Sequence, residues 1–509
     1  MWLGRAAEGL DPTMVPTDPS LPPAVASGTL PGLVPRPRRA KVVTGAIAAI
    51  ATLSLVDIVV VGGRFGAAAD VRPVTVSAPR VAVLSARRAP ELIVDLRARS
   101  RLQAAVADLL SAPSLGAEGA ADSCLLVRQG GRSIATHNPG LGVLPASTMK
   151  VLTATAVLAT TDRNARFTTT VRTARPAVAG VVADLWLVGG GDPILATDAY
   201  LSTFKRQPQI ATSFERLVDG VVAAGISRVT GPVVADERFY DDQRGVDTWK
   251  ASYQARGEVG QLSAMAVNDG FNQTDGTGPW RISAQPAQSA AELLVEMLGQ
   301  RGVVVDGGAR VAAGSDPDAA IAAPVLIAAV ESPPVVEVLS EMLGESDNTT
   351  AELMVKHLGK TSGSAGSTAT GLLALRAALT RAGLDLDQAT FYDGSGLDRN
   401  DRVTCALLAS AVELAPPELI AGLPVGGESG TLSQRMRADS VRGRVKAKTG
   451  SLNGVAALTG VVDANGTTLE FALVLNSLGP ATSGVTVGDE LAALLVAYPD
   501  GPTARDLAP

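Results

Sequence analysis

The sequence predicts an α+β protein in which one domain is interrupted by a second. Period-two patterns typical of β-strands occur near both ends of the folded region, over residues 123–136 and 455–475, and helical patterns lie between them. A gap of 199 positions separates two candidate active-site segments, which contain Ser147 and Ser346. This gap is longer than a helical cap requires, so we expect an inserted domain over about residues 165–325.

The composition of the 509 residues excludes several classes of protein. With 46% hydrophobic and 18% charged residues the chain has ample apolar material for a core, and a net charge of −6 provides no basic surface for nucleic acid. The two histidines and the two cysteines are isolated in the sequence, so we expect neither a metal site nor a cofactor. Whether Cys124 and Cys405 form a disulfide outside the cytoplasm is left open.

The N-terminal region predicts attachment to a membrane. Residues 1–41 have the composition of a disordered cytoplasmic lead, which ends in a cluster of arginine and lysine at positions 36–41. An apolar run over residues 42–63 follows and is long enough to cross a bilayer, with the basic cluster remaining inside. The alternative is a late signal peptide with an A-x-A-like cleavage site at residues 67–69. The folded body should therefore lie on the extracytoplasmic face of the membrane or be secreted to the cell wall space.

The first half of the folded region begins after a linker over residues 64–90. An amphipathic helix is predicted over residues 92–110, and a strand pair over 123–136 turns at Gly130 and Gly131. A helical apolar run then covers residues 151–159, and further strands are expected over 166–188.

The second half carries two helical patterns, over residues 334–343 and 349–358, on either side of a short break. The dipeptide Asn465-Gly466 predicts a β-hairpin between strands at 455–462 and 467–475. A closing helix is expected over residues 487–497, and residues 501–509 form a tail.

Ser147 and Lys150 form the first candidate catalytic pair. A serine three residues before a lysine shares its helix face, so the lysine amine can act as the base for the serine hydroxyl. The same spacing occurs at Ser202 and Lys205, so the spacing alone does not select one pair.

Two later motifs make the first one specific. Ser346-Asp347-Asn348 fills the break between the two helical patterns and, taken alone, is typical of a helix stop and restart. Lys448-Thr449-Gly450 follows alternating charged and apolar residues and, taken alone, indicates a solvated strand end. Together the three fragments occur in the order SxxK, SxN, KTG, which is far more specific than any one of them.

In these motifs the sequence resembles the penicilloyl serine transferases, and within them the class C low-molecular-mass penicillin-binding proteins of peptidase family S13. These are D-alanyl-D-alanine carboxypeptidases and endopeptidases. The resemblance covers about residues 95–498 and departs from many relatives at Asp398, where they have a small polar residue. It includes GGGDPIL at 189–195, GPVVADERFY at 231–240, DGSGLDR at 393–399, LPVGGESGTLSQR at 423–435 and AKTGSL at 447–452.

The resemblance implies a penicillin-binding transpeptidase or β-lactamase-like catalytic domain, an antiparallel sheet flanked by helices. We expect residues 91–164 and 326–500 to form it and residues 165–325 to form the inserted domain. Relatives often carry two inserted domains. Because this insertion is short for two, we expect one, with a third domain reduced or absent.

The resemblance also implies a role for each motif residue. Ser147 is the nucleophile and Lys150 its base, while the backbone N–H groups of Ser147 and Ser451 form the oxyanion hole. Ser346 and Asn348 relay the proton to the leaving amine and hold the substrate's peptide bond. The substrate carboxylate binds Lys448 and Thr449, with Gly450 admitting the substrate close to the strand.

Lys150 can act as a base near neutral pH only if its pKa is lowered. A free lysine has a pKa of about 10.4, and both burial and a nearby cation lower this value. We expect burial together with the positive charge of Lys448 to lower the pKa of Lys150.

The expected function is a serine-type D-alanyl-D-alanine carboxypeptidase that trims peptidoglycan stem peptides through an acyl-enzyme on Ser147 and is inhibited by β-lactam antibiotics. D,D-endopeptidase activity is left open. Two alternatives remain, a β-lactamase or esterase that uses the same site and a catalytically idle, membrane-anchored cell-wall scaffold. A hydrolase with a Ser-His-Asp triad is a less well supported alternative, because the sequence has no GxSxG motif.

Overall fold

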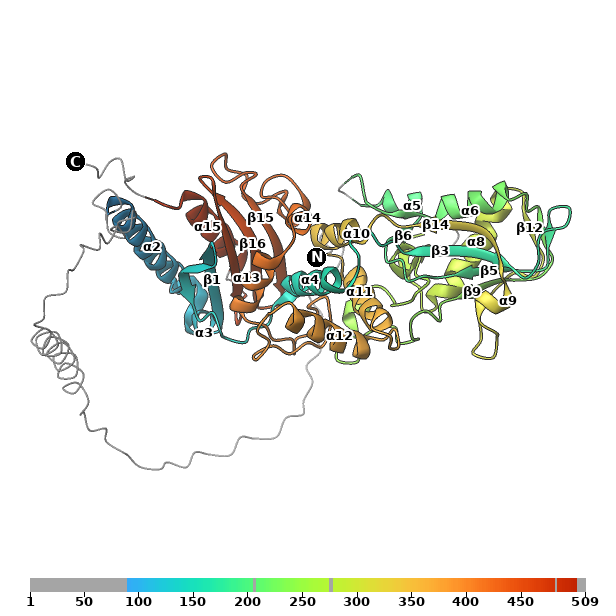
Figure 1. The fold of residues 1–509 in the computed structure, drawn as a ribbon, viewed down its shortest axis with the longest axis horizontal. Coiled ribbons are helices and arrows are strands. Elements are labelled where there is room, and N and C mark those ends of the chain that lie inside the picture. Colours follow the sequence, from blue (N-terminus) through green and yellow to red (C-terminus); the bar gives the residue numbers. More distant parts are fainter. Residues whose placement is uncertain (1–88, 205–206, 274–277, 481–482, 501–509) are drawn as a thin grey trace, which may run out of the picture. The chain divides into compact units, whose positions relative to one another are not determined.

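The structure is a computed structural model that describes residues 89–204, 207–273, 278–480 and 483–500 (Figure 1). The predicted cytoplasmic lead, the membrane segment over 42–63 and the C-terminal tail lie outside these residues. Within the part of the chain that the structure describes, none of the helices combines the length and apolar character needed to cross a membrane.

A five-stranded sheet in the order β15-β16-β17-β1-β2 forms the centre of the catalytic domain, and every neighbouring pair is antiparallel. This confirms the predicted antiparallel sheet. The first two strands therefore pair beside the last three, although more than 300 residues separate them. The strands are β1 (Ser123–Gln129), β2 (Arg132–His137), β15 (Val445–Leu452), β16 (Val455–Ala464) and β17 (Thr467–Leu475).

Both predicted hairpin turns are present. Gly130 and Gly131 join β1 to β2 with φ angles of 54° and 77°, and Asn465 and Gly466 join β16 to β17 with φ angles of 54° and 85°. Two consecutive residues with positive φ match the twist of an antiparallel pair, which explains why Asn-Gly and Gly-Gly mark these turns.

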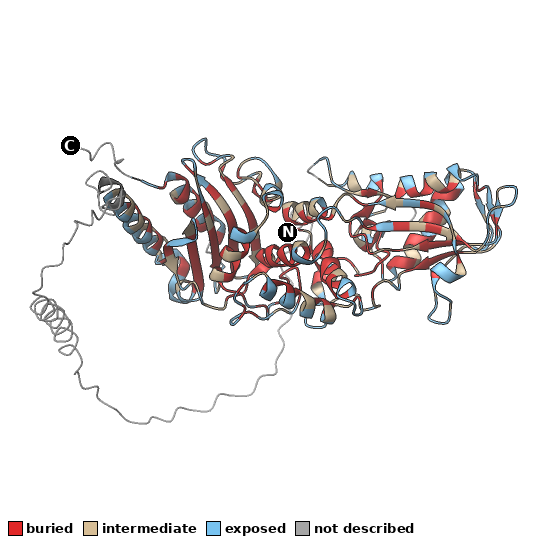
Figure 2. Ribbon diagram, viewed as in Figure 1, coloured by how far each residue is buried: buried red, intermediate tan, exposed pale blue. Residues whose placement is uncertain are grey.

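Helices cover both faces of this sheet. On one face α2 (Ala89–Leu110) and α15 (Gly484–Ala497) pack over a core that includes Phe471 and Leu491. Figure 2 shows the strands and α4 largely in the colour of buried residues. The helices that share the core of the other face are α4 (Met149–Thr160), α10 (Val335–Glu341), α11 (Asn348–Thr361), α12 (Thr368–Arg381), α13 (Cys405–Leu414) and α14 (Pro417–Ala421). Helix α4, which follows Ser147, is thus enclosed by apolar side chains.

A disulfide joins Cys124 on β1 to Cys405 at the start of α13. Both cysteines are fully buried in the core between the sheet and the helices. The pairing that the sequence left open is therefore present, and it closes a loop of 281 residues.

We expect a titration of the unfolded, unreduced chain to find no free thiol, and two after reduction. Replacing both cysteines by serine should lower the free energy of unfolding by about 2–5 kcal/mol, because the unfolded chain regains the entropy of a long loop. Urea unfolding of the two proteins measures this difference. Two reactive thiols in the unreduced chain would contradict the pairing.

The inserted domain is built on a second five-stranded sheet, in the order β13-β9-β5-β3-β14. Strands β5, β9 and β13 are parallel to one another, and β3 pairs antiparallel with both of its neighbours, β5 and β14. Helices α6 (Phe214–Ala223) and α8 (Pro286–Gln300) pack on it. The strands are β3 (Thr168–Thr173), β5 (Leu185–Val188), β9 (Val233–Asp236), β13 (Ala309–Val311) and β14 (Val325–Glu331).

Shorter elements complete this region. A parallel sheet of three two-residue strands, β12-β8-β4, shares the core of α6 and α8. The remaining short elements are β4 (Val181–Val182), β6 (Leu195–Ala196), β7 (Thr212–Ser213), β8 (Arg228–Val229), β10 (Phe271–Gln273), β11 (Trp280–Ile282), β12 (Val304–Val305), α5 (Asp198–Leu201), α7 (Ser252–Ala255) and α9 (Ala319–Ala322).

The predicted end of the inserted domain at residue 325 is wrong by about six residues. Strand β14 pairs with β3 from Val325 opposite Thr173 to Glu331 opposite Thr168, so it belongs to the inserted sheet. Its pairing partner β3 lies about 150 residues upstream, and the apolar sequence of β14 does not indicate which domain the strand joins. The chain returns to the catalytic domain near Ser332.

Candidate active site

Ser147 lies in a short 3-10 turn, Ala146–Thr148, that leads directly into α4. The carbonyl of Pro145 accepts a hydrogen bond from the Thr148 hydroxyl at 2.7 Å, which fixes the turn. Ala146 has a φ angle of 47°, a left-handed conformation that alanine rarely adopts. Such strain persists only where the surrounding structure imposes it, and here it presents the half-buried Ser147 at the start of a buried helix.

Lys150 is fully buried and donates three hydrogen bonds. Its Nζ lies 3.1 Å from Ser147 Oγ, 2.6 Å from Asn348 Oδ1 and 2.8 Å from the Ser395 carbonyl oxygen. The three acceptors come from three separate parts of the sequence. Together they hold the amine against the serine hydroxyl at hydrogen-bonding distance, as a general base requires.

Burial lowers the pKa of Lys150 to about 8, against the opposing effect of the nearby carboxylates of Asp393, Asp347 and Glu352. The pKa of Lys448 falls well below its ordinary value through burial and through the positive charge of Lys150. Of the two causes expected from the sequence, burial is therefore confirmed as the one that lowers the pKa of Lys150, whereas the charge of Lys448 is not among its causes.

Ser346 and Lys448 form the second serine–lysine contact of the site. Ser346 ends a π-helical turn, Met342–Ser346, between α10 and α11, and it has a φ angle of 64°. Its hydroxyl accepts a hydrogen bond from Lys448 Nζ at 2.8 Å. A π-turn and a left-handed serine are both typical of functional sites. Lys448 is fully buried, so it is not the solvated strand end that its alternating pattern indicates when taken alone.

Asn348 is the first residue of α11, and both ends of its amide are used. Its Oδ1 accepts from Lys150, and its Nδ2 donates to the carbonyl of Glu258 at 2.6 Å. Asp347 caps the helix by accepting from the Thr349 N–H at 2.8 Å. The motif thus serves both as a helix cap and as part of the site.

The KTG strand approaches the serine closely. Thr449 donates from its hydroxyl to Thr431 Oγ1 at 2.9 Å. A Cβ atom on Gly450 would lie 2.9 Å from the carbonyl oxygen of Pro145 and 3.0 Å from Cβ of Ala457. The glycine is therefore needed to let β15 pack against the turn before Ser147, a reason additional to the predicted one of admitting the substrate.

A cavity of about 890 Å³ opens onto these groups. Of the eight predicted site residues, Ser147, Ser346, Asn348, Thr449, Gly450 and Ser451 line it, while the amines of Lys150 and Lys448 bind the hydroxyls of two of them. The structure thus brings all eight together. The other polar residues that line the cavity were not predicted as site residues; they are Lys250, Ser252, Tyr253, Arg256, Glu258, Arg399, Thr431, Arg435 and Asn453.

Glu352 is a further residue that the sequence analysis missed. It lies one turn after Asn348 on α11, and its Oε1 accepts from the N–H groups of Gly394 and Ser395 at 3.0 and 2.7 Å. These bonds fix the turn whose Ser395 carbonyl holds Lys150. Burial raises the pKa of Glu352 to about 8, with a further contribution from Asp393. The spacing of four residues from Asn348 is the signal that could have identified it.

Asp398, the departure from the resemblance, accepts a hydrogen bond from the Thr248 hydroxyl through one oxygen. Its other oxygen accepts from the Asn400 N–H at 2.8 Å. Ser202, the serine of the second match to the serine–lysine spacing, donates to the carbonyl of Ala199 at 2.8 Å and does not line the cavity. Its partner Lys205 lies outside the described residues.

The chain matches a known protein family and two characterised relatives. The model of the D-Ala-D-Ala carboxypeptidase 3 (S13) family matches residues 102–278 and 271–496. The chain is 32% identical over 494 residues to a carboxypeptidase DacB of Mycolicibacterium smegmatis, covering 90% of this chain and 98% of that protein. It is 29% identical over 524 residues to a D-alanyl-D-alanine carboxypeptidase of Actinomadura sp., covering 86% and 92%.

The fold is similar to that of a solved structure, penicillin-binding protein 4 of Haemophilus influenzae. The TM-score is 0.60 at 20% identity, over 74% of this chain and 95% of that protein.

Proposed function

This chain belongs to the D-Ala-D-Ala carboxypeptidase 3 (S13) family and is a serine D-alanyl-D-alanine carboxypeptidase, and we propose that it trims peptidoglycan stem peptides through an acyl-enzyme on Ser147. The observation that carries the assignment to Ser147 is the contact of its hydroxyl with a buried lysine of lowered pKa, inside a cavity. β-Lactam antibiotics would acylate the same hydroxyl.

In the proposed acylation step, neutral Lys150 takes the proton of Ser147 as Oγ attacks the carbonyl carbon of the penultimate D-alanine. The backbone N–H groups of Ser147 and Ser451 stabilise the oxyanion that forms. As the C–N bond breaks, the proton that Lys150 took from Ser147 passes through Lys448 and the Ser346 hydroxyl, which are hydrogen-bonded to each other, to the amine of the leaving D-alanine. Water hydrolyses the ester in the second step and regenerates the serine.

We propose that the terminal carboxylate of the substrate binds to Thr449, which lines the cavity, and to Lys448, the neighbouring residue on the same strand. A carboxylate beside Lys448 favours the charged form of this lysine and offsets the effects of its burial. Thr449 already exchanges a hydrogen bond with Thr431, so the substrate would meet a prearranged pair of hydroxyls. Asn348, which lines the cavity between Lys150 and the Glu258 carbonyl, would hold the substrate's peptide bond.

The test uses the full chain, labelled penicillin and a peptide that ends in D-Ala-D-Ala. A stable adduct together with release of D-alanine, both lost in Ser147→Ala, supports the proposal. Ser202→Ala is the matched control, because Ser202 also stands three residues before a lysine and should leave both signals unchanged.

Two other outcomes would favour the alternatives. Rapid penicillin hydrolysis without release of D-alanine would indicate a β-lactamase. Glu258, which lines the cavity, would then be the carboxylate that activates the water for deacylation. The absence of both adduct and D-alanine would indicate an idle scaffold. A cross-linked muropeptide, tested in the same assay, reports D,D-endopeptidase activity.

The rate of acylation by penicillin should rise about tenfold per pH unit below pH 8 and level off above it. Only the neutral form of Lys150 can accept the proton, and burial places the pKa of Lys150 at about 8. Rates measured from about pH 6 to about pH 9 report this profile. A rate that does not change over this range would show that another group is the base.

For localisation, we propose that the catalytic body lies outside the cytoplasm, either anchored by residues 42–63 or secreted after cleavage near residues 67–69. The Cys124–Cys405 disulfide supports this, because such bonds persist in oxidising compartments. Labelling intact cells with a membrane-impermeant reagent tests it. Protection of the body until the cells are lysed would contradict the proposal.

A further inference from the structure

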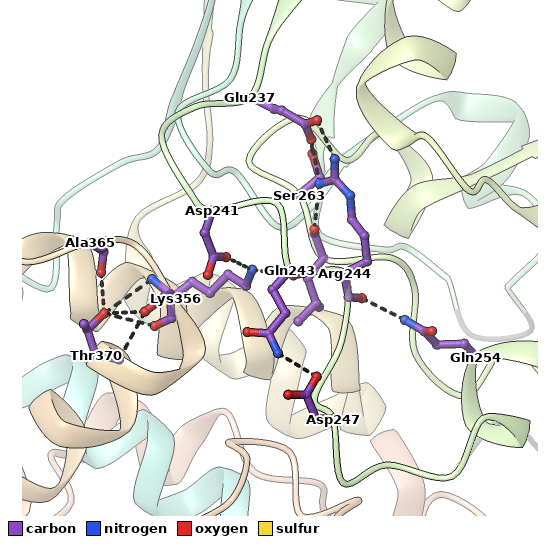
Figure 3. Close-up of polar contacts among 12 residues, drawn as sticks. Glu237, Asp241, Gln243, Arg244, Asp247, Gln254, Ser263, Lys356, Ala365 and Thr370 are labelled. Carbon is purple, nitrogen blue, oxygen red and sulfur yellow. Dashed lines mark hydrogen bonds and ion pairs between the residues drawn. The ribbon is translucent and has the colours of Figure 1, made fainter. Parts of the chain in front are cut away.

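Residues 241–262, here called the strap, fall within the predicted inserted domain but lie on the catalytic domain. Figure 3 shows the base of the strap, where the Arg244 carbonyl accepts from Gln254 Nε2 at 2.8 Å. The same carbonyl accepts from the N–H of Leu262 at 3.1 Å, and the Arg244 side chain is paired with Glu237. The strap is therefore a loop whose two ends are tied together.

The outer part of the strap rests on the active site. Trp249 Nε1 donates to Asp393 at 2.9 Å, in the turn that holds Lys150. The carbonyl of Glu258 accepts from catalytic Asn348. Tyr253 and the neighbouring apolar residues of the strap pack against Leu353 of α11.

The strap also forms one wall of the cavity. Five of its side chains line the cavity, namely Lys250, Ser252, Tyr253, Arg256 and Glu258. A substrate that extends beyond its two terminal residues would meet this wall.

Lys356 fixes the base of the strap to the catalytic domain. This lysine lies on α11, and Asn348, Glu352 and Lys356 recur every four residues along one face of the helix. Its amine is fully buried and donates to the Asp241 carboxylate and, at 2.6 Å, to the carbonyl of Gln243 (Figure 3).

The charged groups around Lys356 have opposite effects on its pKa. Burial lowers the pKa of Lys356, Asp241 acts in the opposite direction, Arg244 lowers it further and Glu352 raises it. A buried ion pair contributes little to stability compared with apolar residues of the same size, whereas its geometry is narrowly defined. We therefore expect the Lys356–Asp241 pair to fix the position of the strap more than it stabilises the fold.

We propose that Lys356 is a positioning residue that sets selectivity for long peptide substrates by fixing the strap, and so the cavity wall, on α11. This inference rests on the proposed carboxypeptidase function. Lys356 itself does not contact the substrate. Its removal should weaken the binding of substrates that reach the wall and spare those that do not.

The experiment compares the full chain with Lys356→Met, Asp241→Asn and the double variant Asp241→Ala/Lys356→Met. For a stem pentapeptide ending in D-Ala-D-Ala we expect KM to rise about tenfold in each, with kcat changed less than threefold. For acetyl-D-Ala-D-Ala, which is too short to reach the wall, kcat/KM should stay within about twofold of the wild type. Arg228→Met is the matched control, because it breaks the exposed Arg228–Asp306 pair elsewhere in the inserted domain and should change neither substrate.

The double variant separates positioning from stability. It leaves no buried charge unpaired, so its Tm should recover relative to Lys356→Met while the KM for the pentapeptide stays raised. Recovery of KM together with Tm, or equal losses for both substrates, would overturn the proposal. If Lys356→Met fails to fold, Asp241→Asn, whose side chain is partly exposed, provides the same comparison.

Adduct formation with labelled penicillin, measured on the wild-type chain, distinguishes failure of the carboxypeptidase function from failure of the role proposed for Lys356. Wild-type chain that forms no adduct and releases no D-alanine from either peptide would refute the carboxypeptidase function itself. A wild-type chain that is active, with variants unchanged for the pentapeptide, would refute only the role of Lys356.

Discussion

Replacing Lys150 by methionine is expected to lower the rate of acylation of Ser147 by about 10³-fold while the protein stays folded. Lys150 is the group placed to take the serine proton, and general bases contribute about 10²–10⁴-fold. Methionine has a similar length and carries no charge, so it removes the base without leaving a buried cation. The oxygens of Asn348 and Ser395 lose a donor, at a cost of about 1–3 kcal/mol each.

The time course of adduct formation with labelled penicillin measures the rate, and thermal unfolding checks the fold. Lys446→Met is the matched control, since Lys446 is partly exposed and lies on the same strand as Lys448. Acylation of Lys150→Met within tenfold of the wild-type rate would show that a different group accepts the proton.

Replacing Glu352 by alanine is expected to have the second largest effect. It leaves the buried N–H groups of Gly394 and Ser395 without an acceptor, so the free energy of unfolding should fall by about 2–5 kcal/mol. The Ser395 carbonyl would then no longer be held against Lys150, and acylation should fall about 10²-fold. Urea unfolding and the penicillin time course measure the two effects.

Glu352→Gln separates the hydrogen bonds from the charge, because its amide oxygen can still accept from both N–H groups. Burial raises the pKa of Glu352 from 4.5 to about 8, so the wild-type fold favours the protonated acid and loses stability as pH rises between these values. The glutamine variant lacks this loss and should be the more stable protein above pH 8. An equal pH dependence of stability in both proteins would show that Glu352 ionises normally.

The hairpin turns and the helix after Ser147 could be predicted from the sequence, because a few neighbouring residues determine each of them. Asn465-Gly466 demands positive φ at two positions, and the apolar run after Ser147 fits a buried helix. The family motifs then assign these elements to one domain. The order of the three motifs was sufficient to predict that eight residues as far apart in the sequence as Ser147 and Ser451 would meet at one site.

Features that depend on distant partners could not be read from the sequence. The alternation around Lys448 indicates an exposed side chain, and only the packing of β15 against the active-site turns buries it. Strand β14 resembles any apolar strand until β3 pairs with it. The strap gives no local sign that it leaves its own domain, because the hydrogen bonds of Lys356 and Asn348 that hold it come from about 90–115 residues further along the chain.

The bond between Cys124 and Cys405 has a consequence for how the chain responds to damage. Because the whole inserted domain lies between the two cysteines, a single cut in the backbone anywhere from residue 125 to residue 404 releases no fragment. Strand β1 stays tethered to α13, so the nucleophile and the KTG strand remain parts of one molecule. A nicked enzyme would migrate as two pieces on a gel only after reduction.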